Sequence, residues 1–117
     1  MPGVTRKLMA AYAVDDIDVA EAFYERLLGR EPDARSGETC IAWQIAPGSW
    51  LELREGAQAG QGGPVRLAVA DVEAARASLD LKFGIEAAVA RTAGGSATCS
   101  FCDPFGNPIV YAEQGKP

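Results

Sequence analysis

The sequence predicts an α+β fold built from two tandem copies of one unit, each a strand and a helix followed by three short strands. Three observations support this prediction. A strand-like apolar run precedes each of two helical patterns, and glycines and prolines then divide the chain into short strands. The two halves also align with each other at an offset of 55 residues, which places Asp16 on Asp71.

The internal match joins residues 14–29 to residues 69–84. Its identical pairs are Val14/Val69, Asp16/Asp71, Ala20/Ala75, Ala22/Ala77 and Gly29/Gly84. These pairs fall where a strand ends, where an acidic residue begins a helix, and where a glycine ends that helix. Because each match has a structural role, we interpret the halves as two copies of one supersecondary unit.

The first unit covers about residues 5–55. Residues 7–14 are the predicted first strand, and Asp18 with Glu21 three residues later is typical of a capping box. The helix that begins there ends at Gly29. Turn chemistry at Ser36-Gly37 and Pro47-Gly48 then separates three predicted strands, at residues 31–36, 39–45 and 49–55.

The second unit covers about residues 64–115 and follows a glycine-rich linker at residues 56–63. Its predicted elements are a strand at 65–69, a helix at 71–81, and strands at 86–92, 96–102 and 108–113. We treat residues 1–117 as a single domain, because a chain of 12.3 kDa is the size of one ordinary domain.

Composition restricts the possible partners. Sixteen acidic and eleven basic residues give a net charge of −5, which disfavours nucleic acid and anionic membranes and favours cationic partners. No apolar stretch approaches the roughly 20 residues that a membrane-spanning helix needs. Three cysteines, without a convincing export signal, indicate reduced thiols and a cytoplasmic protein. The chain has no histidine, which excludes Ser-His and Cys-His catalytic pairs and every metal site that needs histidine.

Three motifs together resemble the vicinal oxygen chelate superfamily. The first is residues 14–29, which begin at Val14 and end in Ala-Phe-Tyr-x-x-Leu-Leu-Gly. The second is the similar helix at 69–84, and the third is Asp-Pro-Phe-Gly-Asn-Pro-Ile-Val-Tyr at 103–111. That superfamily includes glyoxalase I, extradiol dioxygenases and bleomycin-resistance proteins. The resemblance implies two βαβββ modules whose curled mixed sheets enclose a cavity, usually within a homodimer.

The resemblance also implies four positions for metal ligands. They fall on Met9 and Pro64, where the superfamily ordinarily has histidine, and on Glu52 and Val110, where it ordinarily has glutamate. Only Glu52 offers a donor suited to a hard divalent cation. We therefore predict no metal and no other cofactor.

The alternation of side chains along each strand indicates which residues line the cavity. If Met9 faces inward, Leu8, Tyr12 and Val14 pack on the helix instead. Trp50 and Glu52 share a face, where an indole can stack on a planar ligand and a carboxylate can hold a cationic or amide group. The predicted ligand-binding residues are Met9, Trp43, Trp50, Glu52, Arg66, Phe105 and Val110.

Four of these residues also have a structural explanation. Trp50 and Trp43 could be core or interface residues, Glu52 could face solvent, and Arg66 could either pair with Glu52 or be solvated. Cys99 and Cys102 form a C-x-x-C pattern, but residues three apart on a strand point to opposite faces. We therefore interpret Cys99, Cys102 and Cys40 as small buried apolar residues with no redox or zinc role.

Two classes of function are consistent with these residues. The first is a metal-independent protein that binds and sequesters a small molecule, such as an antibiotic, that is hydrophobic, cationic or planar aromatic. The alternative is a metal-free lyase or isomerase in which Glu52 is the general acid or base. A third possibility is a module that only mediates interaction or regulation.

Overall fold

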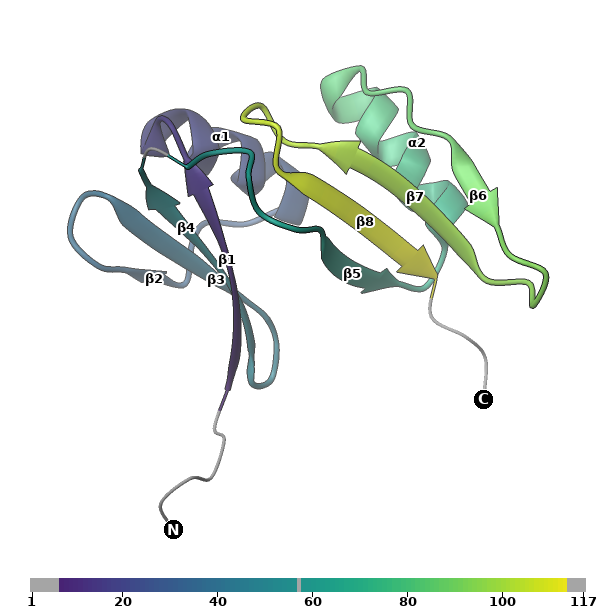
Figure 1. Cartoon of the computed structure of the whole chain (residues 1–117), viewed down its shortest axis with the longest axis horizontal. Coiled ribbons are helices and arrows are strands. Elements are labelled where there is room, and N and C mark those ends of the chain that lie inside the picture. Colours follow the sequence, from purple (N-terminus) through teal and green to yellow (C-terminus); the bar gives the residue numbers. More distant parts are fainter. Residues whose placement is uncertain (1–6, 57, 114–117) are drawn as a thin grey trace, which may run out of the picture. The chain divides into compact units, whose positions relative to one another are not determined.

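The computed structural model describes residues 7–56 and 58–113. The chain divides into two compact units, Met1–Gly62 and Gly63–Pro117, and the boundary falls within the predicted linker. Over the described residues, each unit has one helix and one four-stranded sheet, in the order strand, helix and three strands (Figure 1). The predicted α+β fold with two βαβββ modules is confirmed.

Unit 1 contains a mixed sheet with the strand order β1-β4-β3-β2. β1 and β4 are parallel, whereas β3 is antiparallel to both β4 and β2. Its elements are β1 (Leu8–Val14), α1 (Ile17–Leu28), β2 (Ala34–Arg35), β3 (Cys40–Ala46) and β4 (Ser49–Glu55).

Unit 2 repeats this topology with the strand order β5-β8-β7-β6, in which β5 and β8 are the parallel pair. Its elements are β5 (Val65–Val69), α2 (Val72–Phe83), β6 (Val89–Arg91), β7 (Ala97–Cys102) and β8 (Pro108–Glu113). Within the described ranges, neither helix is long and apolar enough to cross a membrane.

Both helices begin and end with the same local chemistry. Asp16 and Asp71 are the N-caps, with extended backbones and carboxylates that accept hydrogen bonds from N–H groups of the first turn. Gly29 and Gly84 end the helices at φ +79° and +67°, a left-handed conformation that glycine adopts without steric cost. The prediction that Asp18 caps α1 is wrong, because the Asp16 carboxylate already accepts from the Asp18 and Val19 amides.

A second bond to each helix start comes from the end of the sheet. The Ile17 N–H donates to Glu55 Oε2 at 2.9 Å in unit 1, and the Val72 N–H donates to Glu113 Oε2 at 3.1 Å in unit 2. Each glutamate is the last residue of its strand. The first helical N–H groups lack partners within the helix, so these carboxylates satisfy them and also favour the positive end of the helix dipole.

The core of unit 1 lies between α1 and one face of the sheet. Tyr12, Leu51 and Leu53 are buried on the strands, and Tyr24 is buried on the helix. Burial alternates in the middle of β4, where Leu51 and Leu53 are buried and Glu52 between them is half-buried. The prediction that Leu8 packs on the helix is wrong, because its side chain is 70% exposed.

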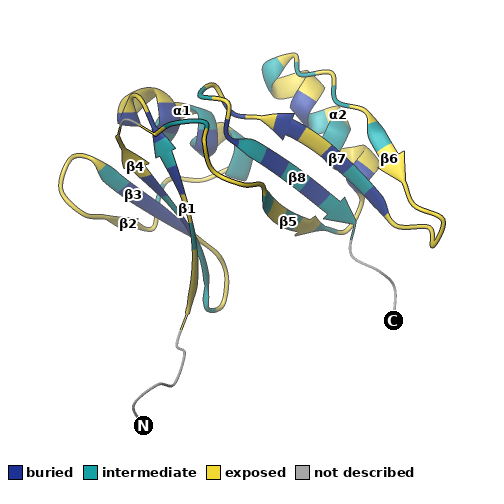
Figure 2. Cartoon of the chain, in the orientation of Figure 1, coloured by how far each residue is buried: buried dark blue, intermediate teal, exposed yellow. Residues whose placement is uncertain are grey.

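Unit 2 has an equivalent core beneath α2. Phe101 and Tyr111 are buried there with their ring centroids 5.2 Å apart, and burial alternates along β7 and β8 (Figure 2). Cys99 is buried as predicted, and both cysteines are free thiols. The prediction that Cys102 is buried is wrong, because alternation along β7 places it on the exposed face of the strand. The expected divergence of the C-x-x-C pair is confirmed.

Two strands are shorter than predicted. Residues 31–36 reduce to β2 (Ala34–Arg35), and residues 86–92 reduce to β6 (Val89–Arg91). Both lie at the edge of their sheets, where pairing with a single neighbour sets the length. α2 in turn extends to Phe83, two residues beyond the predicted end.

The turn between β7 and β8 is held by a buried polar pair. Asp103 Oδ1 accepts from the amides of Phe105 and Asn107, each at 2.9 Å, and Asp103 Oδ2 accepts from Asn107 Nδ2 at 2.9 Å. Asp103 is 5% exposed and Asn107 is fully buried. A buried carboxylate with these donors stabilises the turn, since removing it would leave them without a partner.

We expect Asp103→Ala to lower the free energy of unfolding by about 3 kcal/mol, because three buried or half-buried donors lose their acceptor. Urea denaturation followed by circular dichroism measures this change. Glu86→Ala is the control, since Glu86 is exposed and should change stability by less than about 0.5 kcal/mol. Equal effects of the two substitutions would contradict the structural role of Asp103.

Burial raises the pKa of Tyr111 to about 12. As the pH rises, the unfolded chain therefore loses the Tyr111 proton before the native state does. The contribution of this group to the free energy of unfolding is fully present below about pH 10 and is lost as the pH rises toward 12. Between pH 9 and 11 we expect the wild type to lose about 1 kcal/mol more than Tyr111→Phe. Denaturation curves of both proteins at the two pH values measure this difference, and parallel losses would contradict it.

Candidate functional site

A pocket of about 180 Å³ lies on the sheet of unit 1. Trp50 and Glu52 line it, and they face away from Leu51 and Leu53, which are buried beneath α1. The pocket is therefore on the sheet face that the helix does not cover. Its lining residues are Lys7, Met9, Ala34, Arg35, Ser36, Cys40, Ile41, Ala42, Trp50 and Glu52.

Strand register brings three of the predicted residues together. Met9 on β1 pairs with Trp50 on β4, and Glu52 has Ala11 on one side and Ala42 on the other. The alanines leave room above the sheet, because they carry only a methyl group. The result is a small apolar floor with one indole and one carboxylate, which is the usual composition of a ligand pocket.

The charge of Glu52 is balanced within its own strand. Arg54 Nε donates to Glu52 Oε1 at 2.6 Å, and the Glu52 side chain is 15% exposed against 68% for Arg54. This contact raises the pKa of the Arg54 guanidinium above its usual value. The alternative of an Arg66–Glu52 pair would join residues of the two units and stays a prediction.

Cys40 is a pocket residue that the sequence analysis assigned only to packing. It is half-buried and pairs with Arg54 across β3 and β4. Burial, and then the negative charge of Glu52, raise the pKa of the Cys40 thiol above its usual value. The thiol is therefore protonated at neutral pH, which makes it a weak donor and not a nucleophile.

Lys7 and Arg35 are the other lining residues that the sequence analysis missed. The Lys7 ammonium lies 5.4 Å from the ring centroid of Trp50, within range of a cation–π contact. Arg35 is paired with Glu21 through two nitrogen–oxygen contacts, one of 2.9 Å between Nη1 and Oε1. Lys7 comes just before β1, and Arg35 lies on the short edge strand β2. These positions were the only sequence signal that the two residues line the pocket.

Trp43, another predicted site residue, belongs to the core of unit 1. Trp43 is fully buried on the helix side, with its ring 6.0 Å from Tyr24 and its Nε1 donating to the Arg30 carbonyl oxygen at 3.0 Å. Trp43 does not line the pocket, so we omit it from the site.

Arg66 and Val110 face each other across β5 and β8 in unit 2, and Phe105 is half-buried in the turn that follows β7. The ligand roles of these three residues stay predictions.

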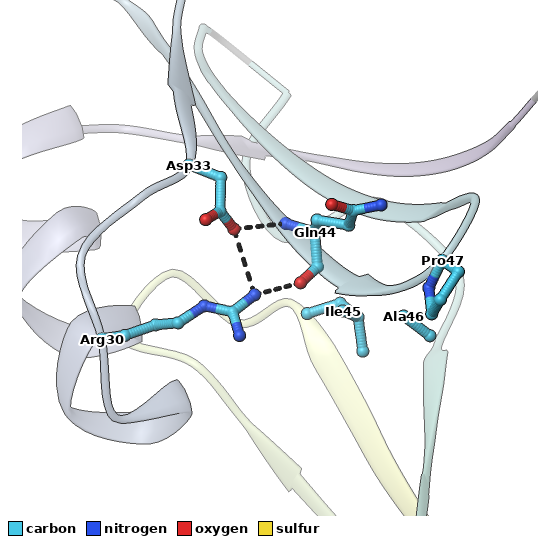
Figure 3. Close-up of a pocket in the computed structure, with 6 residues that line it drawn as sticks. All are labelled: Arg30, Asp33, Gln44, Ile45, Ala46 and Pro47. Carbon is cyan, nitrogen blue, oxygen red and sulfur yellow. Dashed lines mark hydrogen bonds and ion pairs between the residues drawn. The ribbon is translucent and has the colours of Figure 1, made fainter.

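A second hollow in unit 1, of about 360 Å³, has a structural explanation (Figure 3). Asp33 Oδ2 accepts from Arg30 Nη2 at 3.0 Å and from the backbone N–H of Gln44 at 2.8 Å. Arg30 also donates to the backbone carbonyl oxygen of Gln44. These polar groups satisfy one another and join the end of α1 to the irregular part of β3. The hollow is therefore lined in part by groups that hold the structure of unit 1 together.

The residues at the four expected metal positions do not fit a hard divalent cation. Met9 has a thioether, while Pro64 and Val110 have no donor atom in their side chains. Glu52 has a suitable carboxylate, but one of its oxygens already accepts from Arg54. Across the part of the chain that the structure describes, no group of three or more His, Cys, Asp or Glu residues is placed to hold a metal ion.

Solved structures place this architecture in a class. Paired βαβββ modules are the fold of the vicinal oxygen chelate superfamily, and the chain resembles a glyoxalase/bleomycin resistance protein from Catenulispora acidiphila with a TM-score of 0.80. That match has 32% sequence identity over 93% of this chain and 98% of the other. The chain therefore belongs to the glyoxalase/bleomycin resistance protein family.

Two more distant structures share the fold. One is a lactoylglutathione lyase from Agrobacterium tumefaciens, with a TM-score of 0.76, 21% identity and 95% of each chain covered. The other is a bleomycin resistance determinant encoded on the transposon Tn5, with a TM-score of 0.77, 18% identity, and 94% of this chain and 98% of that chain covered. No protein-family model and no curated protein matches the sequence.

The side chains at the four expected metal positions predict that a chelator does not change the stability of the protein. We expect dialysis against EDTA to leave the thermal unfolding midpoint unchanged, because the family's ligand positions offer one usable carboxylate. Thermal unfolding before and after dialysis, with elemental analysis of the purified protein, checks this. One transition-metal ion per chain whose removal lowers the midpoint would refute it.

Proposed function

We propose that this protein is a metal-independent small-molecule binder that sequesters a planar, largely apolar ligand of the antibiotic type. The observation that carries the proposal is the position of Trp50 and Glu52 together on the sheet face that α1 leaves open. The indole stacks on the planar part of the ligand. Glu52 accepts a hydrogen bond from a donor group on the ligand.

The size of the pocket limits how much of the ligand it can hold. About 180 Å³ is less than the roughly 300 Å³ at the lower end for drug-sized ligands. The pocket therefore receives one planar group of the ligand, and further protein surface covers the rest. A homodimer supplies such surface, and we include it in the proposal as the expected assembly.

Binding without turnover is favoured over catalysis by the surroundings of Glu52. Among the residues that line the pocket, Glu52 alone has a carboxylate. Its Oε1 accepts from Arg54 Nε at 2.6 Å and its other oxygen can accept from a ligand, but the lining offers no second carboxylate to complete an acid–base pair. The neighbouring thiol of Cys40 has a raised pKa, so it is not a ready nucleophile. Sequestration needs neither group to react. The Tn5 determinant, whose name states bleomycin resistance, shares this fold.

Trp50→Ala should weaken ligand binding by about tenfold, because it removes the aromatic wall of the pocket. Thermal-shift screening with bleomycin, mitomycin C and other planar antibiotics identifies a ligand, and titration calorimetry then gives its Kd for each variant. Ile45→Ala is the matched control, since Ile45 is a partly exposed apolar residue that lines the other hollow.

Three results would contradict the proposal. The first is that no planar compound in the panel stabilises the protein. The second is that Trp50→Ala and Ile45→Ala change the Kd equally. The third is that the wild type converts the ligand and Glu52→Gln abolishes that turnover. The last result would favour the lyase or isomerase alternative.

A further inference from the structure

The basic side chains around the unit 1 pocket are not all paired. Arg35 is bound to Glu21, and Arg54 is bound to Glu52. Lys7 has no carboxylate partner among residues 7–56 and 58–113, and its contact is with the Trp50 ring. Lys7 is thus an ammonium group at the pocket whose charge is not balanced by a neighbouring carboxylate.

The backbone holds Lys7 at this place. The next residue, Leu8, donates its N–H to the Gly48 carbonyl oxygen at 2.6 Å and pairs with Ser49 at the start of the parallel β1–β4 ladder. Alternation places Lys7 on the same face as Met9, which pairs with Trp50. The ammonium is therefore near the indole because of strand register, not only because its side chain is long.

The contact between Lys7 and Trp50 is weak enough to be shared with a ligand. A cation–π contact at an exposed site changes an equilibrium by only about two- to fivefold. Lys7 is exposed, so its ammonium can move toward a ligand group with little loss. An anionic group beside the indole would gain a partner there, whereas a cationic group would meet an ammonium already on the ring.

We propose that the ligand is a planar aromatic acid, whose ring stacks on Trp50 and whose anionic group pairs with Lys7. This inference rests on the proposed function and specifies the ligand class of that same pocket. Glu52 remains the acceptor for a donor elsewhere on the ligand, because Arg54 contacts only one of its oxygens in the structure. The net charge of −5 favours cations at long range, but the side chains that line this pocket include two basic residues and one acidic one.

Three naphthalene probes of equal ring size test the charge preference. They are 2-naphthoate, 2-naphthalenemethanol and 2-naphthylmethylammonium, and calorimetry or chemical-shift titration at about 0.15 M salt gives each Kd, so that distant charges are screened. We expect the acid to bind most tightly and the amine least tightly. Lys7→Gln should weaken binding of the acid by about three- to tenfold and leave the alcohol within about twofold.

Two further variants separate the local contact from net charge. Lys82→Gln removes the same charge from α2 in unit 2 and should leave all three Kd values unchanged. Lys7→Arg keeps the charge and should retain the preference for the acid. Tighter binding of the amine than of the acid by the wild type, or equal losses with Lys7→Gln and Lys82→Gln, would overturn this inference alone. Failure of all three probes to bind would overturn the proposed function as well.

Discussion

The carboxylate at the end of the last strand in each unit joins the start of the helix to the end of the sheet. Glu55 accepts from the first helical N–H at Ile17, and Glu113 does the same for Val72. Glu55 also lies opposite Val14, the end of β1, in the parallel register. This bond holds the start of the helix beside the end of the parallel strands, and the helix packs on one face of the sheet. Every second strand residue then faces the helix, and the residues between them face the open side.

Much of this scaffold can be predicted from the sequence because it depends on backbone chemistry. β4, β5 and β8 have the predicted bounds, since turn residues or a helix cap limit each of them. Gly29 and Gly84 end the helices because a left-handed backbone favours glycine. The position of the α1 cap was harder to predict, since Asp16 and Asp18 are both suitable and only the geometry of the chain shows which carboxylate reaches the free amides.

The pocket could be predicted only in part, because its far wall depends on one β-bulge. The register of β3 against β4 shifts between Gln44 and Ala46. Regular alternation counted back from the turn would place Trp43 on the face of Trp50 and Cys40 beneath the helix. The bulge reverses this, so Trp43 is buried in the core and Cys40 lines the pocket. The contacts of Lys7 and Arg54 depend on long side chains, whose rotamers a sequence pattern does not specify.

The two units share their scaffold bonds but differ in their open faces. Trp50 and Glu52 of β4 correspond to Pro108 and Val110 of β8, counted from the glycine of each preceding turn. The caps and the strand-end glutamates do not involve these positions, so side chains on the open face can vary while the helix stays in place. The chemistry of the pocket is therefore local to unit 1. Charges more than about 8 Å apart at the surface are largely screened at physiological salt. We therefore expect a few side chains at the pocket to influence the choice of ligand more than the net charge of −5 does.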